Sequence, residues 1–447
     1  MNKVITRFPP SPTGKFHIGS ARTALFNYLF AAHHGGTMYL RFEDTDAERN
    51  KKEHEEDIVD GLRWLGITYT ESTPLRQSER LDVYRNYLHR LIESGAAYEA
   101  EPAENGGGNV VRFKNPNVKI TFSDLIRGEV SFDTAELKDF IIARNTGSPL
   151  YHLAVVADDH DSGITHVIRG EDHISNTQRQ ILIIEALGFK RPIYAHIPLI
   201  LAPDRSKLSK RHGAISLNEY RAEGFVAEAL VNYLALLGWN PGGNRELFSL
   251  AELVKVFDIT QVQKSGAIFD LQKLRWFNHE YLKRLSAEEY GTRFADYIKT
   301  EKKGAPPAYL LEAIPIVRER GETFGHAYEL LHTDCSFLEE TLNGGAPIPV
   351  PLLTKGAKAD AFTVLAHLKK VFELLSGVPA DNFTTDAVKE AVFPYATEHG
   401  RASVLWPLRV ALSGKEKSPD PFTLAGYLGK ERALSRVSNA IELLSRV

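Results

Sequence analysis

The 447-residue sequence contains almost no cysteine, Cys335 being the only one. A disulfide within the chain is excluded, and so is a structural zinc site built on several thiolates. No uninterrupted apolar run reaches the ~20 residues that cross a bilayer, and the first residues lack the features of a targeting presequence. We therefore expect a cytoplasmic protein in a reducing compartment, with no membrane partner.

A second absence concerns phosphate-binding motifs and charge of one sign. The sequence has no Gly-x-x-x-x-Gly-Lys-Ser/Thr loop, which disfavours P-loop kinase or ATPase chemistry. Its 54 Lys and Arg against 57 Asp and Glu give a formal net charge of −3. A nucleic-acid partner would have to meet local basic patches, because the whole molecule is not basic. The length exceeds what one hydrophobic core organises, so several domains are expected.

The first forty residues have the pattern of a strand, a helix and a second strand. Residues 4–8 are an apolar stretch, and prolines at positions 9, 10 and 12 require a loop after it. Apolar residues then recur with helical spacing over residues 20–34, and residues 38–42 begin the next strand. This pattern predicts a right-handed parallel unit, the opening of a doubly wound α/β sheet.

The rest of the chain predicts an interrupted sheet followed by helices. The expected elements are a helix at 74–98, short strands at 110–113 and 140–144, buried strands at 151–156, 166–169 and 195–201, and a helix at 178–187. The strands within residues 110–148 indicate an insertion between two halves of the sheet. Beyond residue 213 we expect mostly helices.

Two motifs carry groups suited to a triphosphate. His17-Ile18-Gly19-Ser20 opens the first predicted helix, where free amides and the helix dipole attract anions. His17 can donate to a phosphate oxygen, Gly19 allows a close approach, and Ser20 can cap the helix. Lys207-Leu208-Ser209-Lys210-Arg211 supplies three cations for the charge that develops on a leaving pyrophosphate. A capped helix beside a loop histidine and a solvated basic turn are the structural alternatives.

A longer ordered set of motifs resembles the class I glutamyl-tRNA synthetases. Its members are residues 7–20, 41–46, 166–173, 269–270 with 273–274, and 407–414. The resemblance covers essentially the whole chain. It implies a Rossmann-like catalytic domain in two halves, 1–75 and 149–212, an inserted acceptor-end-binding α+β domain, 76–148, a helical stem-contact domain, 213–305, and an all-α anticodon-binding domain, 306–447.

The resemblance also implies the reaction and its partners. ATP and L-glutamate would form glutamyl-adenylate and pyrophosphate, with Mg²⁺ on the phosphates, and the 3′ end of tRNA-Glu would take the acyl group. In this family the first step typically awaits the bound tRNA. No zinc is expected, because the insertion lacks the cysteine knuckle of some members, and a monomer is expected.

The site residues implied by the resemblance fall into three groups. For the nucleotide they are His17, Ile18, Gly19, Ser20, Asp172, Ile200, Lys207, Leu208, Ser209, Lys210 and Arg211, of which His17, Gly19, Lys207 and Lys210 would be catalytic. For glutamate they are Arg7, Pro9, Ser11, Glu43, Tyr151, Val155 and Arg169. For the anticodon they are Arg409, Ser418 and Pro419. Arg7 and Arg169 would bind the side-chain carboxylate and Glu43 the α-ammonium, while Tyr151 would close the pocket.

Several residues also have structural interpretations, which the residues alone favour for Arg7, Arg169 and Tyr151. Arg169 has Glu171 and Asp172 close in sequence as ion-pair partners, and Tyr151 suits a core. Residues 401–447 hold eight Lys and Arg against four acids, which suits an RNA backbone or a solvated helical surface. Pro9, Ser20, Val155 and Gln178 depart from the usual residues of the family.

Other functions remain open on the sequence. A truncated paralogue that modifies an anticodon base would lack the C-terminal 150 or so residues, and a glutaminyl-tRNA synthetase would be expected to end in β-barrels. A non-catalytic tRNA- or nucleotide-binding protein on the same fold is a different class of function. The sequence does not decide whether tRNA-Gln is charged as well as tRNA-Glu.

Overall fold

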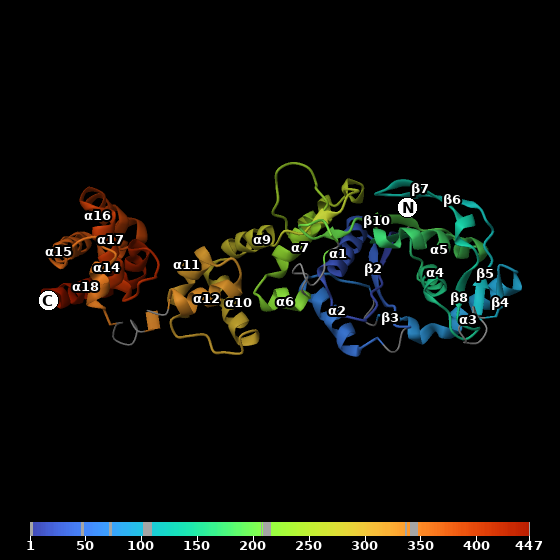
Figure 1. Ribbon diagram of the computed structural model, residues 1–447, viewed down its shortest axis with the longest axis horizontal. Helices are drawn as coiled ribbons and strands as arrows, with labels where there is room; N and C mark the ends of the chain where they lie inside the picture. Colours follow the sequence, from blue (N-terminus) through green and yellow to red (C-terminus); the bar gives the residue numbers. More distant parts are fainter. Residues whose placement is uncertain are drawn as a thin grey trace. The chain divides into compact units, whose positions relative to one another are not determined.

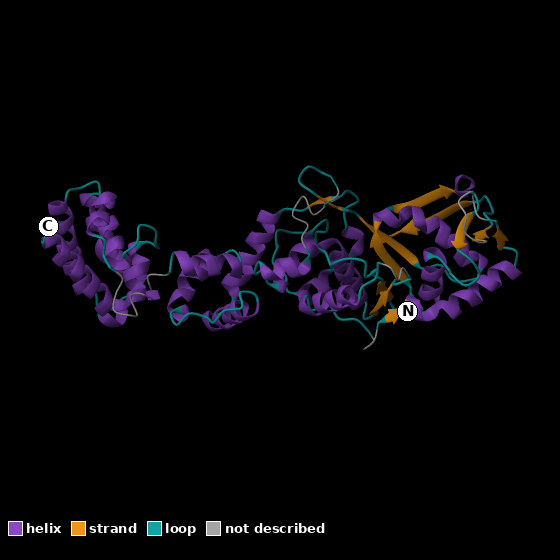
Figure 2. Ribbon diagram, turned by 60° about the horizontal axis from the view of Figure 1, so that its bottom comes forward, coloured by secondary structure: helices purple, strands orange, loops and turns teal. Residues whose placement is uncertain are grey.

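The computed structural model describes residues 3–45, 49–70, 74–101, 110–206, 208, 216–335, 338–339 and 347–446. The chain divides into two compact units, Met1–Tyr281 and Leu282–Val447 (Figure 1). Among the described residues all strands belong to the first unit, and the second consists of helices and loops (Figure 2). The finer division into five domains stays a prediction.

The first unit is built on parallel strands. β1 (Ile5–Phe8) pairs in parallel with β2 (Thr37–Phe42) after the helix α1 (Ile18–His33), and β2 pairs with the short β3 (Leu75–Arg76). A four-stranded sheet has the order β7-β6-β10-β9. Thr165, directly before β9 (His166–Gly170), exchanges hydrogen bonds with Ile5, so β1 and β9 lie side by side. The predicted strand–helix–strand opening and the α/β class are confirmed.

Several of the predicted site residues follow the carboxyl ends of four of these strands. β1 is followed by the proline loop and the histidine motif, β2 by Glu43, β9 by Glu171 and Asp172, and β10 (Ile193–Ile197) by Ile200. β10 pairs in parallel with β9, in a register that sets His196 opposite Arg169. Ligands of α/β proteins bind at this edge of the sheet.

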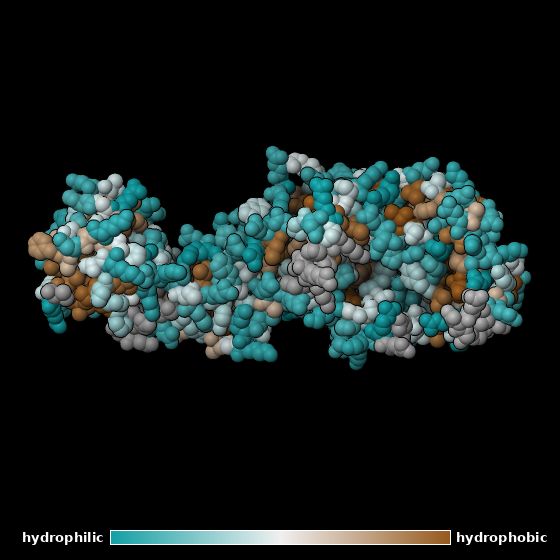
Figure 3. Space-filling model, viewed as in Figure 1, coloured by the Kyte–Doolittle hydropathy of each residue, from teal (hydrophilic) through white to brown (hydrophobic). Residues whose placement is uncertain are grey.

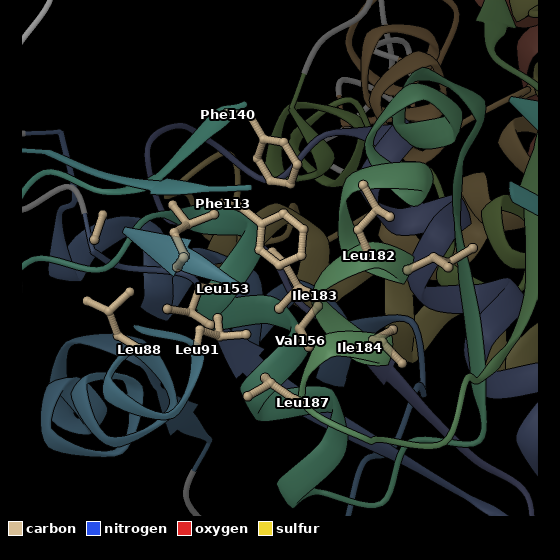
Figure 4. Packing of buried hydrophobic residues seen from close by; sticks show 14 of the residues in the cluster. Leu88, Leu91, Phe113, Phe140, Leu153, Val156, Leu182, Ile183, Ile184 and Leu187 are labelled. Atoms are coloured by element: carbon tan, nitrogen blue, oxygen red, sulfur yellow. The ribbon is translucent and has the colours of Figure 1, made fainter. Parts of the chain in front are cut away.

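The inserted strands share one core with the helices beside them. β4 (Ala97–Ala100), β5 (Val110–Phe113) and β8 (Phe140–Ala143) form an antiparallel sheet, while β6 (Lys119–Asp124) and β7 (Gly128–Asp133) form a hairpin. Phe113 and Phe140 stack at 5.2 Å beside Leu153 of α4 (Tyr151–Asp161) and Ile183 of α5 (Ile174–Ala186) (Figure 4). Each such buried side chain contributes about 1.5–3 kcal/mol. The predicted strands of this region are confirmed.

The remaining elements of the first unit are mostly helices. They are α2 (Lys52–Trp64), α3 (Leu81–Glu93), α6 (Leu217–Ala222), α7 (Ala227–Leu236), α8 (Leu250–Val256) and the start of α9 (Leu271–Arg284). The pair β11 (Ile200–Leu201) and β12 (Ala267–Ile268) is parallel. Ser216 and Ser249 begin α6 and α8 with reciprocal capping boxes, which satisfy amides that the first turn leaves free.

The second unit has a helical core. Its helices are α10 (Ala287–Thr300), α11 (Leu310–Arg320), α12 (Phe324–Thr333), α14 (Val350–Lys355), α15 (Ala361–Gly377), α16 (Thr385–His399), α17 (Arg401–Ser413) and α18 (Pro421–Ser445). α17 packs against α15, α16 and α18. Hydrophilic side chains cover much of the face seen in Figure 3. Within the described ranges no helix is both long and apolar enough to cross a membrane.

Three predicted elements are wrong in type or extent. The expected strand at 151–156 is the first part of α4, because a short apolar run buried on all sides fits either element. The expected helix at 74–98 is reduced to α3, with β3 before it and β4 after it. The expected strand at 195–201 breaks into β10 and β11 at Pro198, which has no amide hydrogen to donate to a neighbouring strand.

Candidate active site

His17 begins α1 as its N-cap. Its Nδ1 accepts a hydrogen bond from the backbone N–H of Ser20 at 3.3 Å, and its Nε2 lies 3.2 Å from the Ser20 hydroxyl. The prediction that Ser20 caps the helix is therefore wrong, because Ser20 already lies within the first turn. A Cβ at Gly19 would come within 3.1 Å of the imidazole, so glycine leaves the ring room to fold over the helix end.

The basic motif lies mostly outside the described residues, which exclude Lys207, Ser209, Lys210 and Arg211. Leu208 is described, and its N–H donates to the carbonyl of Ile200 at 3.2 Å. After the motif, Ser216 pairs with His17 in an isolated antiparallel bridge, and the N–H of Leu217 donates to the Phe16 carbonyl at 2.8 Å. The chain that leaves the basic motif therefore returns to the histidine motif.

A short segment between β10 and β11 is fixed from two sides. Arg22 of α1 donates from Nη1 to the Pro198 carbonyl at 2.7 Å, and Glu171 accepts from the N–H of Leu199 at 2.7 Å. Burial lowers the pKa of Arg22 to about 10, against the opposing influence of Glu171. These contacts set the position of Ile200, which is buried, whereas Asp172 is exposed. Sequence reasoning assigned no role to Arg22 or Glu171 here.

Arg7 lies buried beside a carboxylate of α4. Its Nε is 3.2 Å from Asp159 Oδ1, and its Nη1 has no hydrogen-bond partner among the described residues. Arg41 binds the same aspartate at 2.7 Å and also lies 3.3 Å from Glu43 and 3.6 Å from Asp158. Asp159 was missed because it lies 152 residues from Arg7, although two adjacent aspartates in an apolar stretch are a signal.

Arg169 has a different environment, in which every hydrogen-bond acceptor among the described residues is neutral. Its Nε donates to His196 Nε2 at 3.2 Å, its Nη1 to Gln180 at 2.8 Å, and its Nη2 to Thr177 at 2.7 Å. Glu171, a suggested ion-pair partner, instead pairs with Arg127. Burial lowers the pKa of Arg169, yet an arginine remains a cation at neutral pH.

The two arginines belong to one charged cluster with Glu43 and Tyr151. Burial raises the pKa of Glu43, and the positive charges of Arg41 and Arg7 oppose that shift. Burial, reinforced by the charge of Glu43, raises the pKa of Tyr151 to about 12, with Arg169 and Arg7 opposing. The Tyr151 hydroxyl lies 3.2 Å from His173 Nδ1. Tyr151 thus lies within electrostatic reach of the three other predicted glutamate-site residues of this cluster, Glu43, Arg7 and Arg169.

The other three predicted glutamate-site residues, Pro9, Ser11 and Val155, are uncharged and make no direct side-chain contact with this cluster that the structure records. The Glu43 N–H donates to the Pro10 carbonyl at 3.0 Å, which joins the loop of Pro9 and Ser11 to the cluster. Ser11 itself is exposed and Pro9 half-buried. Val155 is buried in α4. No group of three or more metal-ligating side chains occurs within the part of the chain that the structure describes.

In the second unit the predicted anticodon residues lie around the end of α17. The Arg409 guanidinium lies 4.6 Å from the ring centre of Trp406, and its Nη2 donates to the Glu416 carbonyl at 3.0 Å. Ser418 is half-buried, and Pro419 is buried. Arg436 is buried as well and donates to the Ala411 carbonyl, so it does not add to a basic surface.

Two family models cover nearly the whole chain. One describes the catalytic domain of class I tRNA synthetases (E and Q) and matches residues 3–106 and 99–276, and the other describes an anticodon binding domain and matches residues 272–441. The parallel sheet, with a histidine-capped helix beside the return of the basic loop, agrees with that class. The chain belongs to the class I tRNA synthetases of the E and Q type.

Individual proteins similar to this chain are glutamate–tRNA ligases. A glutamate–tRNA ligase of Aquifex aeolicus is 41% identical over 488 residues and covers 100% of both chains. One of Desulforamulus reducens is 38% identical over 495 residues, 98% of this chain and 99% of the other. The crystal structure of a glutamate tRNA ligase from Elizabethkingia meningosepticum in complex with its amino acid matches with a TM-score of 0.82 and 32% identity, covering 99% and 100% of the chains.

The cluster makes a prediction about stability. Asp159→Asn removes the negative charge that Arg7 and Arg41 share, so we expect the first unit to lose about 3–5 kcal/mol of unfolding free energy. Asp82→Asn is the control, because Asp82 is 91% exposed and pairs only with Arg85 among the described ion pairs; its effect should stay within about 0.5 kcal/mol. The unfolding free energies of both variants are measured by urea titration, with hydrogen exchange of the α4 amides as the readout for the first unit. Equal losses in the two variants would contradict the stabilising role of the Asp159 charge.

Proposed function

We propose that the chain is a glutamate–tRNA ligase, which activates L-glutamate with ATP and transfers it to the 3′ end of tRNA-Glu. The observation that carries the proposal is the buried cation Arg169, which has only neutral hydrogen-bond acceptors among the described residues and lies within electrostatic reach of Arg7 and Tyr151. The names of the relatives that match along the whole chain support the same activity.

The charges of the cluster complement those of free glutamate. A buried, unpaired carboxylate would lose several kcal/mol, and a planar guanidinium matches it with two hydrogen bonds. Arg169 and Arg7 receive the side-chain carboxylate, and Glu43 receives the α-ammonium. Tyr151 and Val155 line the pocket, and Pro9 and Ser11 contribute the loop above it. A neutral glutamine side chain would leave the charge of Arg169 uncompensated, which favours glutamate as the substrate.

The nucleotide occupies the helix end and the segment after β10. The N-terminal end of α1 at Ile18 and Gly19, the Ser20 hydroxyl and the His17 imidazole meet the phosphates, as anions favour helix N-termini. Ile200, Leu208 and Asp172 lie near the base and ribose. By their place in the sequence, Lys207, Ser209, Lys210 and Arg211 complete the phosphate site, with Mg²⁺ on the phosphates and no zinc.

The reaction has two steps. A glutamate α-carboxylate oxygen attacks the α-phosphorus of ATP, and the bond to pyrophosphate breaks. The terminal ribose hydroxyl of the tRNA then attacks the acyl carbon, gives up its proton, and AMP leaves. Neither step needs a covalent bond to the protein, so positioning and charge stabilisation supply the catalysis.

The RNA partner contacts several predicted domains. Residues 76–148 bind the acceptor end, residues 213–305 the stem, and residues 306–447 the anticodon, with Arg409, Ser418 and Pro419 near the bases. The protein acts as a monomer. A form that also charges tRNA-Gln is the alternative, and the anticodon-binding match is compatible with both.

Pyrophosphate exchange and charging assays test the proposal. Protein, ATP, glutamate and labelled pyrophosphate should exchange label in the presence of tRNA-Glu, and tRNA-Glu should be charged. Arg169→Ala removes charge-assisted hydrogen bonds to the substrate and should raise the KM for glutamate by about 10- to 100-fold, with the KM for ATP unchanged. Arg191→Ala, an arginine that pairs with Glu185 at the surface, is the control.

The other outcomes of this assay separate the alternatives. An absence of exchange under every condition would favour a non-catalytic binding protein. Equal charging of tRNA-Gln and tRNA-Glu would establish the less selective form. An unchanged KM for glutamate in Arg169→Ala would remove that arginine from the pocket.

The pKa shift of Glu43 predicts a pH dependence. Glu43 must be ionised to bind the α-ammonium, and burial raises its pKa against the influence of Arg41 and Arg7. As the pH falls from neutrality, Glu43 becomes protonated before an ordinary glutamate does, so the KM for glutamate should rise. Glu43→Gln should have a raised KM that no longer depends on pH in this range. The same slope in both proteins would exclude Glu43 as the titrating group.

The second unit makes a prediction about tRNA. Arg409→Ala should raise the KM for tRNA-Glu by about 10-fold and leave those for ATP and glutamate unchanged, because one RNA contact contributes about 1–3 kcal/mol. Arg432→Ala, an exposed arginine on α18 outside the predicted anticodon residues, is the matched control. Steady-state charging kinetics measure both, and equal effects would argue for non-specific electrostatics.

A further inference from the structure

A buried carboxylate–imidazole pair lies directly behind Arg169. Asp124 ends β6, and its Oδ2 is 2.6 Å from Nδ1 of His196 on β10. The carboxylate also accepts hydrogen bonds from the backbone N–H groups of His196, Ile126 and Arg127 at 2.9–3.3 Å. Both side chains have a relative exposure of 0%. Burial opposes ionisation of Asp124, but these hydrogen bonds hold its pKa below the usual range.

The pair sets the tautomer of the imidazole. An ionised carboxylate only accepts hydrogen bonds, so Nδ1 of His196 carries the proton. Burial lowers the pKa of His196, which keeps the ring neutral at neutral pH and leaves a lone pair on Nε2. That lone pair faces the Nε–H of Arg169 at 3.2 Å and the Thr177 hydroxyl at 3.1 Å. Asp124 therefore makes His196 an acceptor for Arg169.

The imidazole fixes Arg169 without neutralising it. Three side chains and one backbone carbonyl accept hydrogen bonds from the guanidinium, namely His196, Gln180, Thr177 and His173. None of them is a carboxylate. A direct ion pair with Asp124 would have satisfied the charge of Arg169, whereas a neutral ring between the two keeps the orientation and leaves the charge for a ligand.

We propose that Asp124 and His196 are positioning residues that hold Arg169 for the acidic side chain of the substrate and thereby set the preference for a carboxylate over an amide. The inference rests on the proposed function, because it requires that Arg169 binds glutamate. It gives residues 76–148, to which Asp124 belongs, a part in building the amino-acid site.

Two substitutions of His196 test the roles of its two ring nitrogens separately. The amide of an asparagine can occupy the place of Nδ1, and that of a glutamine the place of Nε2. His196→Asn therefore keeps a donor for Asp124 and loses the acceptor for Arg169, so the KM for glutamate should rise about 10-fold with little change in the KM for ATP. His196→Gln keeps the acceptor and should stay within about 3-fold of the unmodified protein.

Asp124→Asn tests the tautomer. The asparagine can present its NH₂ group to Nδ1, which moves the imidazole proton to Nε2 and sets a donor against the Arg169 donor, as is known for catalytic triads. We expect a rise in the KM for glutamate as large as in His196→Asn. In the His196→Gln background, Asp124→Asn should have little further effect, because a glutamine amide has no tautomer to switch.

A matched control and the opposing outcomes complete the experiment. Tyr290→Phe alters a buried tyrosine of α10, whose hydroxyl has no hydrogen-bond partner among the described residues and which is not among the groups that act on Arg169, and should leave the KM for glutamate unchanged. Glutamate and glutamine binding, measured by calorimetry, should show that the preference for glutamate over glutamine falls in His196→Asn and Asp124→Asn.

Failure of the unmodified protein to activate glutamate would refute the proposed function. An active protein in which these two variants keep the original glutamate KM and selectivity, or in which Asp124→Asn acts equally in both backgrounds, would overturn the inference.

Discussion

Two adjacent carboxylates on α4 hold three arginines beneath the sheet edge. Asp159 binds Arg7 and Arg41, while Asp158 lies 3.6 Å from Arg41 and 2.8 Å from Arg80. Buried ions lose their hydration, and each is tolerated only where its partner stands in good geometry. The positions of β1, β2 and the start of α3 are therefore constrained against one helix.

Arg169 is buried without a direct ion pair among the described residues, unlike Arg7. The two arginines therefore offer different electrostatic environments to a ligand. Arg7 shares a carboxylate, so a ligand at its unpartnered Nη1 gains a hydrogen bond from a charge that is already balanced. Arg169 has no carboxylate among its described hydrogen-bond acceptors and only a longer-range attraction to Asp159, so a ligand carboxylate there also gains the attraction of a charge that lacks a direct ion pair. Glu43 adds the opposite charge within the same cluster. An amino acid bound as proposed would therefore meet opposite charges at its two charged ends.

The sequence predicted those parts of the fold and site that depend on local pattern. Strand, helix and strand over residues 4–42 follow from apolar spacing and from prolines at positions 9, 10 and 12, and the structure has these elements. The sequence could not predict Asp159 beside Arg7 or Asp124 behind His196, because such pairs join residues far apart in the chain. Likewise, whether residues 151–156 form a helix or a strand depends on what packs around them, which a short apolar run does not encode.

His17 has a structural role at the start of α1 besides its proposed contact with phosphate. Its imidazole caps α1, a task usually given to Ser, Thr, Asp or Asn, and the cap holds the ring at the end of the helix dipole. Ser216 then binds the same residue through the backbone, so the cap is also where the chain from the basic motif is anchored. A serine in place of His17 would preserve the helix but withdraw the ring from this junction. Capping alone would accept a smaller residue, so the proposed phosphate contact is what gives a histidine an advantage at this position.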